Sequence, residues 1–169
     1  MEIDMENEEK KDSNKITRRF AIAVYNMCRV GQFGKPISSK FRYMLSYNLA
    51  KTEPEYKATM DAYPPDPKFL EFISKRDGIN KEFNVTTEAD IAALPADVKP
   101  VYFKRHDELK EQYADAIAVA QNGTPEYNKF LDEEIELELR HVSIDDVPAT
   151  ILNPNDADIW SVLYQLIKD

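Results

Sequence analysis

The chain has 169 residues, of which 43% are hydrophobic and 31% are charged, and its formal net charge is −9 at pH 7. This length and hydrophobic content predict a globular chain that folds without disulfides or metals, and they exclude an intrinsically disordered protein. Cys28 is the only cysteine, and no apolar run approaches the roughly 20 residues that a membrane helix needs. Because the amino terminus also lacks the features of a signal peptide, we expect a cytoplasmic protein or a part of an intracellularly assembled particle.

Charge is distributed unevenly along the chain. Residues 1–12 carry six acids and two lysines, residues 13–52 carry eight bases and no acid, and residues 53–169 carry 25 acids and 12 bases. A basic segment of this length in an acidic protein predicts pairing, either with the acidic half of the chain or with an external anion.

The amino-terminal part is expected to be an arm followed by helices. Residues 1–14 are polar without a repeating apolar face and predict a flexible acidic arm, followed by a single domain over residues 15–169. Apolar residues recur at steps of three and four over residues 16–30, which favours a helix, although residues 20–25 are also compatible with a strand.

The second predicted helix begins near Ser38 or Ser39, either of which can cap it. Pro54 predicts a kink in this helix or a fresh start at Thr52, because proline removes a backbone donor. Three prolines in residues 63–67 then predict a turn.

The middle of the chain is also expected to be helical. We predict a short helix over residues 68–75, ended by Asp77 and Gly78, and a longer one over residues 101–120. Asn122-Gly123 is typical of a helix end, and Thr124-Pro125 is typical of a new start.

Residues 134–140 change the period from helical to alternating. Every second residue is Ile or Leu and the others are charged, which predicts a strand with one buried face. A final amphipathic helix is expected from Asn153 onward. Together these elements predict an α+β fold that is mainly α, with a helical hairpin, a short acidic strand and a docked C-terminal helix.

The order of these elements, with the segment YNKFLDEEIELELRHVSIDDV over residues 127–147, resembles a group of small phage-encoded helical proteins of unknown function. The resemblance covers residues 15–168 and rests on patterns of residue type. It implies a phage origin, and with it a location in the host cytoplasm or in a virion. It brings no activity, cofactor or site residue with it.

Few residues suggest chemistry. Cys28 with His106 or His141 has the residue types of a nucleophile and base, but Cys28 lies on the apolar face of its predicted helix, which favours a packing role. The four glycines form no phosphate-binding loop, and no metal-ligand spacing surrounds His106. We therefore expect no enzyme and no cofactor.

The charged segments are the best candidates for function. Bases interleaved with tyrosines over residues 13–52 have the composition of a nucleic-acid surface, but a net charge of −9 opposes such binding, so nucleic acid is the weaker alternative to a protein partner or self-association. No membrane partner is expected. The predicted partner-binding residues are Arg18, Arg19, Arg29, Lys40, Arg42, Glu134, Glu136 and Glu138.

Two hypotheses follow from these charges. The first is a non-enzymatic, phage-encoded interaction or assembly protein that uses the opposed basic (13–52) and acidic (53–169) halves. The second is an acidic inhibitor of a host nucleic-acid enzyme or defence protein. In that hypothesis the acids imitating phosphates are Asp132, Glu133, Glu134, Glu136 and Glu138.

Overall fold

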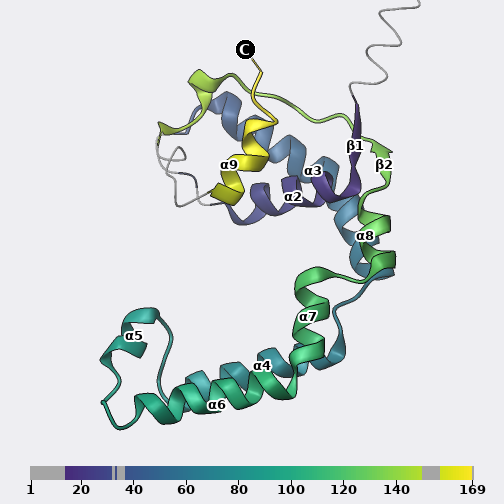
Figure 1. Ribbon diagram of the computed structural model, residues 1–169. Helices are drawn as coiled ribbons and strands as arrows, with labels where there is room; N and C mark the ends of the chain where they lie inside the picture. The colour runs from purple at the N-terminus through teal and green to yellow at the C-terminus, as the bar shows by residue number, and fades with distance from the viewer. Residues whose placement is uncertain (1–13, 32, 34–36, 150–156, 169) are drawn as a thin grey trace, which may run out of the picture. The chain divides into compact units, whose positions relative to one another are not determined.

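The computed structural model describes residues 14–31, 33, 37–149 and 157–168 (Figure 1). The chain divides into two compact units, which we call the terminal unit (residues 1–62 and 126–169) and the inserted unit (residues 63–125). The single domain expected over residues 15–169 stays a prediction. The predicted arm lies outside the described residues except for Asn14.

Helices α2 (Arg18–Val30) and α3 (Ser39–Ala62) form the hairpin of the terminal unit, and α9 (Ala157–Tyr164) packs against α2 (Figure 1). Strands β1 (Lys15–Thr17) and β2 (Glu134–Glu136) pair antiparallel, with Ile16 opposite Ile135. The predicted α+β fold, mainly α, is confirmed, with its hairpin, acidic strand and docked helix.

Helix α2 begins two residues later than predicted. The Thr17 hydroxyl accepts the backbone N–H of Phe20 at 3.2 Å and caps the helix, while residues 15–17 form β1. The alternative strand over residues 20–25 is wrong, because these residues are helical. With three residues, β1 is too short to show an alternation of polar and apolar residues in the sequence. It forms because it pairs with β2, more than 100 residues further along the chain.

Helix α3 continues through Pro54, so the predicted fresh start at Thr52 is wrong. Thr52 is fully buried, and its hydroxyl donates to the carbonyl oxygen of Asn48 at 2.7 Å. Ser38 caps α3 as predicted, because its hydroxyl accepts the Phe41 N–H at 3.1 Å. A proline removes one helical hydrogen bond, and the packed faces on either side outweigh that loss.

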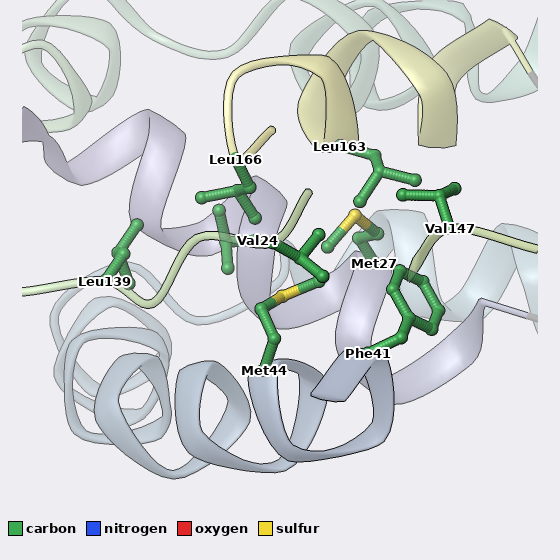
Figure 2. Close-up of a cluster of buried hydrophobic side chains, with 9 residues drawn as sticks. Val24, Met27, Phe41, Met44, Leu139, Val147, Leu163 and Leu166 are labelled. Carbon is green, nitrogen blue, oxygen red and sulfur yellow. The ribbon is translucent and has the colours of Figure 1, made fainter. Parts of the chain in front are cut away.

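The core of the terminal unit joins distant parts of the chain (Figure 2). Side chains of α2 and α3 meet the segment after β2 and the C-terminal residues, and a fully buried side chain of this kind contributes about 1.5–3 kcal/mol. The core residues are Val24, Met27, Phe41, Met44, Leu139, Val142, Val147, Leu163 and Leu166.

The acidic strand is shorter than predicted. Only Glu134–Glu136 pairs with β1, and the next amide, that of Leu137, donates to the carbonyl of Asn14 at 2.9 Å. Exposure still alternates beyond the strand: residues 134, 136, 138 and 140 are exposed, and residues 135, 137 and 139 are covered. The predicted alternation of covered and exposed residues is therefore confirmed, but the strand itself ends where its partner β1 ends.

The inserted unit consists of α4 (Pro67–Glu82), α5 (Glu88–Ala93), α6 (Lys99–Gln112) and α7 (Ala114–Asn122) around a second core that contains Phe72, Ile79, Val85, Tyr102, Leu109 and Tyr113. Helix α4 continues past Gly78, so its predicted end near residue 75 is wrong. The single helix predicted over residues 101–120 is two helices divided at Tyr113.

Predicted helix boundaries around residue 123 are confirmed. Gly123 follows α7 with φ 69°, and α8 (Pro125–Leu131) begins at the proline. The expected start of the last helix at residues 153–156 lies outside the described residues. None of the helices in the described ranges has the length and apolar character needed to cross a membrane.

Candidate interaction surfaces

Arg18 forms ion pairs and hydrogen bonds within the terminal unit. Its Nε lies 3.1 Å from a Glu55 carboxylate oxygen, and its Nη1 lies 2.7 Å from Glu133 and donates to the Phe130 carbonyl at 3.0 Å. The guanidinium also stacks 3.9 Å from the centroid of the Phe130 ring, and the side chain is only 16% exposed. Burial opposes its charge, but the hydrogen bonds to Glu133 and Glu55 outweigh burial and raise the pKa of Arg18.

Two further cations of the basic segment pair with the acidic half. Arg19 Nε lies 2.8 Å from Asp132, and this hydrogen bond lowers the pKa of the Asp132 carboxyl. Lys40 Nζ lies 3.4 Å from Asp146. Pairing between the two halves of the chain is thus observed within the terminal unit.

Other cations remain available. Arg29 ends α2 with its guanidinium 5.9 Å from the Tyr25 ring centroid, and Arg42 lies on the exposed side of α3. Within the part of the chain that the structure describes, Arg29, Arg42, Lys51 and Arg140 make no ion pair. An external group can therefore reach these four cations without displacing an ion pair seen in the described residues.

A flank of α3 combines cations with aromatic rings. Tyr43, Tyr47 and Lys51 follow one another at steps of four, so they lie on one side of the helix. The ring centroids of Tyr43 and Tyr47 are 6.0 Å apart, and Tyr43 is 58% exposed. Lys51 Nζ lies 5.5 Å and the Arg140 guanidinium 5.0 Å from the Tyr47 centroid. We call Tyr43, Tyr47, Lys51, Arg140 and His141 the tyrosine–arginine surface.

Asn48 fixes Arg140 beside this flank. The buried Asn48 amide donates to the Arg140 carbonyl at 3.0 Å, and its Oδ1 accepts the Arg140 N–H at 2.8 Å. An open groove of about 440 Å³ lies alongside, lined by Ser39, Lys40, Tyr43, Met44, Arg140, His141 and Val142. Two hydrogen bonds from a fully buried side chain hold the segment after β2 in one position on α3.

The acids of β2 and the residues after it remain exposed. Glu134 lies opposite Thr17 and Glu136 opposite Lys15 in the sheet register. Glu134, Glu136 and Glu138, which we call the acidic row, are exposed and form no ion pair with any described residue. Their mutual repulsion favours contact with an external cation.

The predicted partner-binding residues therefore divide into two groups. Arg18, Arg19 and Lys40 are engaged by the chain's own acids, whereas Arg29, Arg42 and the acidic row are exposed. Lys51, Arg140 and His141 are absent from the predicted set. The sequence does hold an indication of this surface. Asn48 lies on the buried face of α3, and a buried amide side chain needs a hydrogen-bond partner from elsewhere in the chain.

The titratable candidates for chemistry have shifted pKa values. Burial raises the pKa of the Cys28 thiol to about 12. Burial, together with the nearby Lys168 charge, lowers the pKa of His141, and burial with Lys110 and other cations lowers that of His106. Over the described ranges, no three His, Cys, Asp or Glu side chains are grouped so that they could hold a metal ion.

No protein-family model, curated protein or solved structure matches this chain. A phage origin stays a prediction from the sequence.

Proposed function

We propose that this is a non-enzymatic, phage-encoded interaction or assembly protein that acts through one charged face of the terminal unit. This charged face consists of the tyrosine–arginine surface and the acidic row. The observation that carries the proposal is that Lys51 and Arg140, which form no ion pair with any described residue, lie beside the Tyr47 ring, while Glu134, Glu136 and Glu138 of the same unit are exposed and are likewise unpaired among the described residues.

The composition of this face fits a protein interface. Tyrosine and arginine are enriched at interfaces and among the residues that contribute most to binding, because each offers a large contact area and specific hydrogen bonds. Opposed charges on one face orient a partner and accelerate its association more than they tighten binding. The two hydrogen bonds between Asn48 and Arg140 hold part of this face in place before a partner arrives, which reduces the entropy lost on binding.

A non-enzymatic role agrees with the state of Cys28. A thiol with a pKa of about 12 supplies almost no thiolate at neutral pH, and the thiolate is the nucleophile in cysteine catalysis.

The alternative of an acidic inhibitor has less support. Of the five acids proposed to imitate phosphates, Asp132 is bound to Arg19 and Glu133 to Arg18. Three glutamates in one row remain, whereas imitation of a nucleic-acid backbone requires acids spread over a wider surface.

Site-specific photo-cross-linking in producing cells tests the proposal. A photoreactive phenylalanine analogue replaces Tyr43 in the full chain, and a matched control places it at Tyr164, which is 67% exposed on α9. We expect a discrete cross-linked species from position 43 that disappears in the K51E/R140E background. No species from position 43, or the same species from both positions, would contradict the proposal.

A further inference from the structure

We infer that the partner of the charged face is a second copy of this chain, related to the first by a two-fold axis. The inference rests on the proposed function and names the occupant of the same face.

The two parts of the charged face adjoin one another on the same side of the chain. Residues 134, 136, 138 and 140 are exposed while the residues between them are covered, so Glu138 and Arg140 point to the same side. Two residues span at most about 7 Å of chain, so Glu138, the last residue of the acidic row, lies beside the tyrosine–arginine surface.

Adjacent patches of opposite charge are suited to a two-fold interface. In such an interface, a residue i of one copy contacts residue j of the other, and j contacts i in return. A two-fold axis between the patches brings Glu136 and Glu138 of each copy against Lys51 and Arg140 of its partner. Each pairing of opposite charges then occurs twice, once on either side of the axis, and the partly exposed tyrosines supply apolar contact area near the axis.

Other occupants fit this pattern less well. A phosphate backbone that approaches Arg140 also approaches Glu138, and an acidic protein segment meets the same repulsion from the acidic row. The partner must carry both signs of charge in a matching arrangement, which a second copy does. The net charge of −9 per chain opposes association only weakly, because charges separated by more than about 8 Å are screened at physiological salt.

Charge reversal combined with light scattering tests the inference on the full chain. The acid reversal is E136K/E138K, and the base reversal is K51E/R140E. Because reversal places like charges opposite each other, we expect wild type at twice the 19.5 kDa chain mass and each reversed variant to lose affinity by about 100-fold or more. Mixing the two variants restores a dimer, and so does the chain carrying all four changes, since both arrangements place opposite charges together again.

Matched control variants reverse the same number of charges outside the charged face. E111K/D115K and K68E/K81E reverse exposed residues of the inserted unit and leave the dimer intact. Circular dichroism melts establish that every variant is folded. A wild-type mass of 19.5 kDa at all concentrations, or no dimer on mixing folded reversed variants, would overturn the inference.

The cross-linking experiment separates this inference from the proposed function. A species of two chain masses from position 43 supports both. A species that contains another protein supports the proposed function but overturns the inference that the partner is a second copy. A nucleic-acid adduct also overturns that inference. The absence of any species contradicts both.

Discussion

The side chain of Asn48 and the backbone of Arg140 exchange two hydrogen bonds, with Nδ2 3.0 Å from the Arg140 carbonyl oxygen and Oδ1 2.8 Å from the Arg140 amide nitrogen. Asn48 is fully buried on α3, and Arg140 lies 92 residues further along the chain. This contact joins the helical hairpin to the segment after β2, and it therefore supports both the fold and the charged face.

Asn48→Ala should destabilise the protein by about 2 kcal/mol, because it leaves the partly buried Arg140 amide and carbonyl without their hydrogen-bond partner. Urea unfolding monitored by circular dichroism measures the change. Asn26→Ala, at an exposed position of α2, is the matched control and should change stability by less than about 0.5 kcal/mol. Equal unfolding midpoints for the two variants would show that the paired bonds contribute little.

Arg18→Ala should cost about 2–3 kcal/mol, because it leaves Glu55 and Glu133 without their shared cation and exposes the Phe130 ring. Arg18→Lys should recover only part of the loss, since an ammonium cannot reproduce the planar contacts of the guanidinium. The exposed Arg42→Ala serves as the control and should leave stability nearly unchanged. A loss in Arg42→Ala as large as that in Arg18→Ala would contradict the distinction between engaged and available cations.

Two glycines should respond in opposite directions to alanine. Gly123 has φ 69° and ψ 171°, a region that residues with a Cβ avoid, so Gly123→Ala should cost about 1–3 kcal/mol. Gly78 lies inside α4 with open space where a Cβ would be, so Gly78→Ala should stabilise by about 0.5–1 kcal/mol. Thermal melts of the two variants give the comparison, and a stabilised Gly123→Ala would refute the assigned conformation.

Cys28 should react slowly with thiol reagents in the native protein. Its pKa of about 12, against about 8.5 for a free cysteine, lowers the thiolate fraction at neutral pH by roughly three thousandfold. Labelling with a chromogenic disulfide at pH 8 measures the rate, and the same chain in denaturant provides the fast reference. A native rate similar to the denatured one would mean that the thiol is not buried.

His106 should make the protein less stable as the pH falls. Burial and the Lys110 and Arg76 charges lower its pKa in the folded state, so the unfolded chain binds the proton more readily. The stability associated with neutral His106 is complete above the ordinary histidine pKa and is lost as the pH falls toward the lowered value. Its Nε2 is also buried and has no hydrogen-bond partner among the described residues.

His106→Phe removes that proton-binding group while keeping a ring beside Tyr102, 4.5 Å away between centroids. We expect a weaker decline in the free energy of unfolding between pH 7 and pH 5 for this variant than for wild type. Denaturant melts at both pH values measure the decline. His141→Phe is the comparison in the terminal unit, and identical pH profiles for wild type and His106→Phe would contradict the prediction.

Local sequence patterns predicted much of the secondary structure. The steps of three and four in α2 and α3, the cap at Ser38 and the boundary at Gly123 are signals within a few residues, and the structure confirms them. The predictions were wrong where contacts with a distant segment determine the local structure. Strand β1 depends on β2, and α3 continues through Pro54 because its buried face packs on both sides of the proline.

The charged face was predicted only in part for the same reason. Counting charged residues along the sequence is enough to identify the basic and acidic segments. The pairing of each cation, however, depends on long-range contacts such as that of Arg18 with Glu133, 115 positions apart. Lys51 and Arg140 lie together because Asn48 holds the Arg140 backbone against α3, a contact between residues 92 positions apart.

The insertion of residues 63–125 into the terminal unit sets an order of events during synthesis. Every core side chain of the inserted unit, from Phe72 to Tyr113, has left the ribosome before Leu163 and Leu166 are translated. The amino-terminal hairpin must wait for those two leucines to complete its own core. During that interval its apolar residues stay accessible to chaperones and proteases, while the inserted helices can already have assembled.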